Sequence, residues 1–156
     1  MWIKTFFANT LGRAIPDEPY LKWQYRRKTG KKLHLDPPVT FNEKLQWLKI
    51  HDHNPLYTTL VDKIAVKEYV REKLGDEYII PTLGVWDTID DVDFDALPEQ
   101  FVLKANHDSG SVAICRDRNA FDIEKVKQKF HKRMNSNHYW WGREWPYKNV
   151  KPRIFA

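Results

Sequence analysis

The chain contains a single cysteine, Cys115, and no hydrophobic run long enough to cross a membrane. One thiol excludes an intramolecular disulfide and any zinc site built on cysteines. The first apolar run stops at Ala8 and includes Lys4, so it is too short for the core of a secretory signal peptide. These absences predict a protein of the reducing cytoplasm without a transmembrane segment.

Charge of one sign forms no long block, although 26 Lys and Arg against 21 Asp and Glu leave a net charge of +5. A basic chain can attract nucleic acid, a phosphorylated metabolite or an anionic membrane surface. Because the basic residues are scattered, we expect most of them to be solvated and expect no nucleic-acid partner. The signatures GxxxxGK[ST] and GxGxxG are also missing, which excludes a P-loop and the usual dinucleotide-binding loop.

Aromatic residues, in contrast, are plentiful, with 7 Trp, 7 Tyr and 8 Phe in 156 residues. Large rings supply the apolar area that offsets the entropy lost on folding, so the chain is predicted to be globular. Residues 1–38 are interpreted as a basic, partly irregular leader, and residues 39–156 as one domain.

Capping residues and apolar spacing predict several helices. Thr40 and Glu43 form a capping box ahead of apolar residues at helical intervals. Asp62 is a good N-cap for a later helix, and Gly75 is its natural stop. The helices predicted in this way cover residues 20–25, 41–51, 62–74 and 121–134.

Short runs rich in apolar residues predict strands between these helices. The predicted strands cover residues 78–80, 83–86, 101–105, 111–115 and 150–156. The acidic segment 87–95 is expected to be an exposed loop or a short helix. The aromatic segment 139–147 is expected to be a loop.

The segment FVLKANHDSGSVAIC, residues 101–115, places a lysine inside an apolar strand. Side chains of a strand alternate between two faces, so Phe101 and Leu103 face the core while Lys104 points from the other side. In the loop that follows, Gly110 lets backbone N–H groups turn toward an anion. A lysine beside such donors can hold phosphate, and a plain hairpin with an outward lysine is the alternative.

Three further groups could carry chemistry. His51 and His53 do not share a helix face, so a surface cluster is favoured over a metal site. His107 and Asp108 lie in the loop, where binding or loop ordering is favoured over proton transfer. An aromatic cluster either packs internally or stacks on sugar or base rings. Its members are Trp140, Trp141, Arg143, Trp145 and Tyr147.

Three blocks of sequence together resemble one protein family. They are FNEKLQWLKIHDHNPLYTTLVDKIAVKEYV, IIPTLGVWDTIDDVDFDALPEQFVLKANHDSGSVAIC and GREWPYKNVKPRIFA. Over about residues 38–156 the chain is similar to the teichuronopeptide-biosynthesis, or TupA-like, branch of ATP-grasp proteins. The resemblance implies an α+β fold: an N-terminal nucleotide-binding subdomain with a mostly antiparallel sheet and helices, preceded by a helical leader.

Carried over residue by residue, the ATP-grasp pattern makes Lys63 and Lys104 phosphate contacts. The loop that closes over the triphosphate would contain Asp108, Ser109, Gly110 and Ser111. The strand that leads to the adenine-binding hinge would contain Arg153, Phe155 and Ala156. The cofactors implied are ATP and Mg²⁺, with the metal ligands expected beyond Ala156, so no catalytic or metal-binding residue is assigned. The chain by itself is therefore not expected to be catalytically competent.

Three functions follow from this resemblance, whose members are associated with capsular and cell-wall polysaccharide clusters. The favoured one is the N-terminal, ATP-phosphate-binding portion of a ligase that activates a carboxylate as an acyl phosphate for a polysaccharide precursor. The alternative is a glycosyltransferase that uses a sugar nucleotide, for which Asp91-Val92-Asp93 and Asp93-Phe94-Asp95 match an Asp-x-Asp metal motif. A non-catalytic binding module or remnant is the third.

Overall fold

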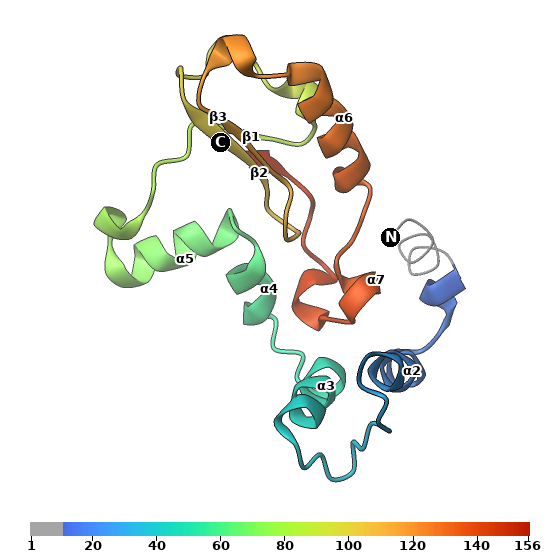
Figure 1. Cartoon of the computed structure of the whole chain (residues 1–156). Helices are drawn as coiled ribbons and strands as arrows, with labels where there is room; N and C mark the ends of the chain where they lie inside the picture. The colour runs from blue at the N-terminus through green and yellow to red at the C-terminus, as the bar shows by residue number, and fades with distance from the viewer. Residues whose placement is uncertain (1–10) are drawn as a thin grey trace. The chain divides into compact units, whose positions relative to one another are not determined.

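Figure 1 shows the chain as a computed structural model in which residues 11–156 are described. The chain forms two compact units, each built from two segments of sequence. Unit 1 comprises Met1–Thr58 and Asn137–Lys148, and unit 2 comprises Thr59–Ser136 and Asn149–Ala156. Helices and an antiparallel sheet both occur, so the fold class is α+β, as predicted.

Unit 1 is helical over its described residues. Its elements are η1 (Leu11–Ala14), α2 (Asp17–Thr29), α3 (Phe41–His51), the first residues of α4 (Leu56–Val61), α7 (Tyr139–Gly142) and η5 (Trp145–Tyr147). Helix α2 ends at Gly30, whose φ of 73° suits glycine and whose amide donates to the carbonyl of Arg26 at 2.8 Å. Helix α2 therefore extends well beyond the short helix predicted over residues 20–25.

Helix α3 begins with the capping box that the sequence predicts. The Thr40 side chain accepts from the amide of Glu43, and the Glu43 carboxylate accepts from the amide of Thr40 at 2.8 Å. The Thr40 amide and the Thr40 hydroxyl both donate to the Glu43 carboxylate, and these hydrogen bonds to the charged form lower the pKa of Glu43 to about 2. The apolar stripe of Phe41, Leu45 and Leu48 is exposed, so the amphipathic spacing of α3 does not mark a core-facing side.

A fully buried arginine, Arg143, joins the segments of unit 1. Its guanidinium carbon lies 4.4 Å from the ring centroid of Tyr20, and its Nε lies 3.3 Å from the carboxylate of Asp17. Its Nη2 donates to the carbonyl of Gly12 at 2.6 Å. The prediction of a loop over residues 139–147 is wrong, because aromatic packing around this cation orders the segment into α7 and η5.

Unit 2 is built around a sheet whose strand order, within residues 11–156, is β1-β4-β2-β3. The strands are β1 (Val85–Trp86), β2 (Phe101–Ala105), β3 (Val112–Cys115) and β4 (Ile154–Phe155). All neighbouring strands are antiparallel. Strands β2 and β3 form a hairpin (Figure 1), and β4 pairs with both β1 and β2. The C-terminal segment thus lies beside the strand that carries Lys104.

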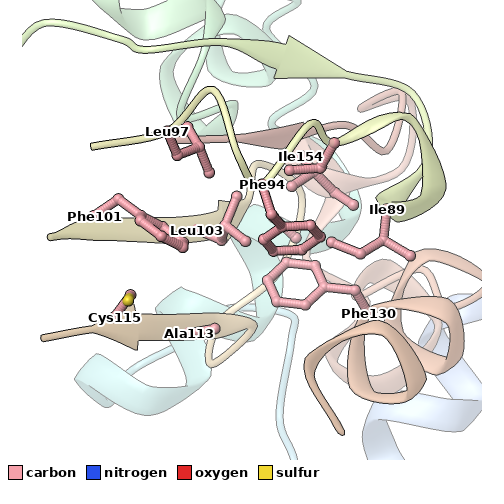
Figure 2. Packing of buried hydrophobic residues seen from close by; sticks show 11 residues of the cluster. Ile89, Phe94, Leu97, Phe101, Leu103, Ala113, Cys115, Phe130 and Ile154 are labelled. Atoms are coloured by element: carbon pink, nitrogen blue, oxygen red, sulfur yellow. The ribbon is translucent and has the colours of Figure 1, made fainter. Parts of the chain in front are cut away.

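The core of unit 2 lies on one face of this sheet, against helix α6 (Ile123–Met134). Phe130 of α6 packs in one buried cluster with Leu103 of β2, Ile154 of β4 and Ile89 (Figure 2). Each such side chain stabilises the fold by about 1.5–3 kcal/mol relative to an exposed one. Burial alternates along β2 as the sequence predicts, and Lys104 is among its partly exposed positions.

The remaining elements of unit 2 are α5 (Ala65–Leu74), η2 (Asp76–Tyr78), η3 (Ile89–Asp91) and η4 (Arg118–Ala120). Helix α5 begins three residues after Asp62, but the Asp62 carboxylate caps its start by accepting from the amides of Ile64 and Ala65 at 2.8 and 3.2 Å. The strand predicted over residues 78–80 is wrong. The amide of Ile79 donates back to the carbonyl of Asp76 and closes the turn η2 instead.

Candidate functional site

Lys104 lies on the face of β2 opposite the core, next to the loop that joins β2 to β3. Its register partners are Val112 on β3 and Phe155 on β4, so its side chain leaves the middle of the sheet. Across residues 11–156, no hydrogen bond or ion pair engages its ammonium group. An ammonium group that lacks a counterion in the folded chain is suited to bind an anion.

The loop after β2 is closed by its own hydrogen bonds. The hydroxyl of Ser111 donates to the carboxylate of Asp108, and both side chains are buried. Ser109 and Gly110 form the exposed tip, where Gly110 has a φ of 105°. In the described part of the chain, the amides of these two residues donate to no other group. The loop therefore has a fixed base and a tip with open N–H donors.

Lys63 reaches this loop from the segment that precedes α5. Its Nζ donates to the carbonyl of Asn106 at 3.1 Å and also to the carbonyl of Asp108. Burial lowers the pKa of Lys63, the nearby positive charge of Lys104 lowers it further, and the carboxylates of Asp108 and Asp62 oppose both effects. The two lysines predicted to contact phosphate thus lie close enough to influence each other.

Asn106, which the sequence did not single out, connects three segments of unit 2. It is fully buried, and its amide Nδ2 donates to the carbonyl of Lys151 at 2.9 Å. Its Oδ1 accepts from the amide of Arg153 at 2.7 Å, while its own amide donates to the Arg153 carbonyl at 3.0 Å. Together with the hydrogen bond from Lys63, these contacts fix the start of the loop relative to the segment before β4.

Arg153 joins the same group of residues through its side chain. One guanidinium nitrogen lies 3.7 Å from the carboxylate of Asp62, whose other oxygen caps α5. The Nε of Arg153 is buried and has no hydrogen-bond partner within residues 11–156. Further along, Phe155 pairs with Lys104 and is buried, and the amide of Ala156 donates to the carbonyl of Gly84 at 3.1 Å.

A third lysine, Lys67, also lies near Lys104 and was missed in the sequence. It follows Lys63 by four residues, a spacing that places both lysines on one face of the helix predicted over residues 62–74 and could have indicated Lys67. Its Nζ donates to the carbonyl of Ile80 at 2.9 Å and lies 5.4 Å from the ring centroid of Phe155. Burial lowers the pKa of Lys67, and the charge of Lys104 lowers it further. Lys63, Lys67 and Lys104 are called the lysine cluster below.

His107 is buried directly after Asn106. Its Nε2 lies 3.3 Å from the carbonyl of Arg133, at the end of α6, while its Nδ1 is buried without a hydrogen-bond partner in the described chain. Burial lowers the pKa of His107, and the negative charge of Asp108 opposes this effect. The ring therefore links the loop to the end of α6. A role in loop ordering rather than proton transfer stays a prediction.

Several other sequence candidates lie outside this group. Within residues 11–156, no three His, Cys, Asp or Glu side chains gather as a metal site. The carboxylates of Asp91 and Asp93 accept from neighbouring groups in their own turns. His51 lies against Trp47, and His53 stacks on Trp145 with 4.8 Å between ring centroids. The aromatic cluster of residues 139–147 belongs to unit 1, whereas the lysine cluster belongs to unit 2.

Comparison with known proteins gives one match. The family described as TupA-like ATPgrasp matches residues 43–156, which is most of the chain and includes all of the lysine cluster. No curated protein and no solved structure matches the chain. None of the described helices is both long enough and apolar enough to span a membrane.

Proposed function

The chain belongs to the TupA-like ATP-grasp family, and we propose that its lysine cluster binds the phosphate groups of ATP. The observation that carries this proposal is the ammonium group of Lys104. It is the member of the cluster that no hydrogen bond or ion pair engages within residues 11–156, and it lies beside a loop with open backbone donors. Proteins of this family generally bind ATP and Mg²⁺.

The three lysines would contribute unequally to phosphate binding. Lys104 offers the phosphate oxygens a cation that no hydrogen bond or ion pair engages within residues 11–156, whereas Lys63 and Lys67 already donate to main-chain carbonyls. Lys63 would exchange part of its contact with the loop for a phosphate oxygen. The lowered pKa values of Lys63 and Lys67 reflect burial and like charge, and a phosphate would relieve the like-charge repulsion.

The loop would contribute main-chain donors rather than charged side chains. Its exposed tip, Ser109-Gly110, carries the open amides, and the Asp108–Ser111 hydrogen bond shapes its base. Adjacent N–H groups around a glycine with positive φ form a concave donor surface for an anion. In this proposal Asp108 and Ser111 serve the site by holding the loop, and Ser109 and Gly110 contact phosphate.

The strand β4 would supply the base-binding side of the site. Phe155 lies in register with Lys104, so the ring and the cation leave neighbouring positions of the same face of the sheet. Arg153 is held by Asn106 and Asp62 just before this strand. We assign Arg153, Phe155 and Ala156 to the approach to the adenine ring.

Mg²⁺ has no fitting site among the described residues, because no cluster of suitable ligands occurs within residues 11–156. Two carboxylates lie near the lysine cluster. That of Asp62 accepts a hydrogen bond at the start of α5, and that of Asp108 accepts one from the hydroxyl of Ser111 within the loop. What this chain supplies is charge neutralisation and orientation of the phosphates. No metal-dependent step is assigned to its residues.

The reaction that this site would serve is ATP-dependent ligation in the synthesis of a cell-surface polysaccharide. ATP would phosphorylate a carboxylate, and an amine or hydroxyl of the polysaccharide precursor would then displace phosphate from the acyl phosphate. Within this reaction the chain is the ATP-phosphate-binding part. Its contribution is to hold the triphosphate in line for transfer.

A calorimetric titration of the full chain with ATP, ADP and AMP tests the proposal. Affinity should fall with each phosphate removed, and Lys104→Ala should weaken ATP binding at least about tenfold through loss of a charge-assisted contact. Lys125→Ala removes an exposed lysine of α6 and should leave the affinity unchanged. Equal affinity for ATP and AMP, or an unchanged affinity in Lys104→Ala, would contradict the proposal.

A further inference from the structure

The C-terminal half of α2 and the residues after it form a basic surface on unit 1. Five of the seven residues from Arg26 to Lys32 are basic, and all seven are exposed. The sequence has no Asp or Glu between Pro19 and Leu35. Arg26, Arg27, Lys28, Lys31 and Lys32 are called the α2 basic surface below.

Within residues 11–156, no Asp or Glu side chain forms an ion pair with these five basic residues. Lys22, one turn earlier, pairs with Glu18 at 2.5 Å. In contrast, the side chains of Arg26, Lys31 and Lys32 make no hydrogen bond or ion pair with any residue of the described chain. Basic residues in the last turn of a helix are stabilised by the helix dipole. Lys31 and Lys32 lie beyond the end of α2, so the dipole stabilises them little. Their mutual repulsion favours an anionic partner.

Two half-exposed indole rings adjoin these cations. Trp23 is 46% exposed, with the Arg27 guanidinium 4.7 Å from its ring centroid. Trp141 of α7 is 49% exposed, with the Lys28 ammonium 5.3 Å from its ring centroid. The carbonyl of Trp141 accepts from Nε2 of Gln24 at 2.9 Å, which fixes α7 beside α2. The surface therefore combines unpaired positive charge with amphipathic rings.

We propose that the α2 basic surface binds the anionic face of a phospholipid bilayer. Tryptophan rings with long basic side chains around them suit the headgroup region, where the ring is half buried and the cations meet lipid phosphates. Clusters of four to eight basic residues bind anionic lipid in a salt-dependent way. A single-stranded nucleic acid fits less well, because stacking a base on either indole would compete with the cation that already lies over it.

Sedimentation of the full chain with unilamellar vesicles tests this directly. The chain should partition onto vesicles of phosphatidylcholine with one third phosphatidylglycerol, and much less onto phosphatidylcholine alone. Raising the salt concentration from 50 to 500 mM should release it, because binding rests on charge. Equal binding to both vesicle types, or no binding to either at 50 mM salt, would overturn the proposal.

Matched variants locate the surface. Arg26→Ser/Lys31→Ser/Lys32→Ser removes three exposed cations that make no side-chain hydrogen bond or ion pair in the described chain, so folding should be unaffected and partitioning should fall at least about tenfold. Arg116→Ser/Lys125→Ser/Lys127→Ser removes the same charge from unit 2 and should bind like the parent chain. Equal losses in the two triple variants would show that net charge, not this surface, drives binding, and would overturn the proposal.

The fluorescence of Trp23 and Trp141 gives a second measurement. Binding through charge alone would not change it. Brominated lipids quench indole fluorescence at the headgroup boundary, and this quenching should decrease in Trp23→Phe or Trp141→Phe. If neither substitution changes the quenching, or if the parent chain binds a single-stranded oligonucleotide more tightly than anionic vesicles at the same salt concentration, the bilayer is the wrong partner. ATP affinity should be the same in the basic-surface variant, since the lysine cluster lies in unit 2.

Discussion

The ammonium group of Lys63 donates a hydrogen bond to the carbonyl oxygen of Asn106 at 3.1 Å, which links the start of α5 to the end of β2. The same ammonium donates to the carbonyl of Asp108, inside the loop proposed to cover the phosphates. A lysine proposed to contact ATP therefore also holds the loop in the free chain. A phosphate that attracts Lys63 would weaken its hold on the loop, so ligand binding and loop movement should be coupled.

Lys63→Ala should loosen the loop while leaving the rest of unit 2 folded. Hydrogen exchange of the Asn106 and Ser111 amides should speed up by about tenfold, because a charge-assisted tether is worth about 1.5–3 kcal/mol. Lys67→Ala is the matched control, since Lys67 donates to the carbonyl of Ile80 and to the hydroxyl of Thr82, away from the loop. Unchanged exchange in the loop of Lys63→Ala would show that the tether is unimportant.

Asn106→Ala should destabilise unit 2 by about 1–3 kcal/mol, because it leaves the part-buried amide of Arg153 and carbonyl of Lys151 without their hydrogen-bond partner. Denaturant unfolding measures the change in the free energy of unfolding. Asn119→Ala, at an exposed position, should alter it by less than about 0.5 kcal/mol. A loss of similar size in both variants would contradict the role given to Asn106.

The buried side chain of His107 should make the free energy of unfolding depend on pH. Burial lowers its pKa in the folded chain below the unfolded value near 6.5, so the unfolded chain binds more protons between these two values. Stability contributed by the neutral ring is present above pH 6.5 and is lost as pH falls from 6.5 toward the folded pKa. Thermal unfolding between pH 7.5 and 5 should show this loss.

His107→Gln keeps a donor for the carbonyl of Arg133 and removes the titration, so the part of the pH dependence due to residue 107 should disappear. His131→Gln changes an exposed histidine paired with Asp90 and serves as the control. The interpretation is wrong if the His131 variant, rather than the His107 variant, flattens the profile.

Arg143→Met should destabilise unit 1 by about 3–5 kcal/mol, because the carboxylate of Asp17 and the carbonyl of Gly12 lose a buried cationic partner. Arg143→Lys should recover little, since an ammonium group cannot make the divergent contacts of the guanidinium or stack as well on Tyr20. Near-UV circular dichroism of the aromatic residues follows the melting of this unit. Full stability in Arg143→Lys would show that charge alone suffices there.

Local signals in the sequence predicted several elements of both units. The capping box of Thr40 and Glu43, the alternation along β2 and the glycine stop at Gly75 all involve residues a few positions apart. Such patterns determine local structure through backbone hydrogen bonds and through the regular alternation of side chains. They can therefore be recognised in the sequence before any tertiary contact is known. The phosphate-binding roles of Lys63 and Lys104 stay predictions that rest on the family resemblance and on their geometry.

Long-range contacts account for what the sequence did not predict. Asn106 reads as an ordinary loop residue until Arg153, 47 positions later, lies beside it. The sequence placed Arg143 in an aromatic cluster but left open whether that cluster packs internally, and in the structure aromatic rings from both segments of unit 1 enclose the guanidinium. In both cases the tertiary fold determines which residues are in contact. Secondary-structure propensity and local spacing cannot predict such contacts.

A Lys104 ammonium group that contacts the phosphates of ATP should be protected from acylation when ATP is bound to the unmodified chain. The rate at which an N-hydroxysuccinimide ester modifies each lysine can be measured by mass spectrometry with and without saturating ATP. We expect ATP to slow the modification of Lys104 at least about fivefold, since an ammonium held by phosphate is a poor nucleophile, and to leave exposed Lys125 unaffected. Modification of Lys104 at the same rate in saturating ATP would contradict it.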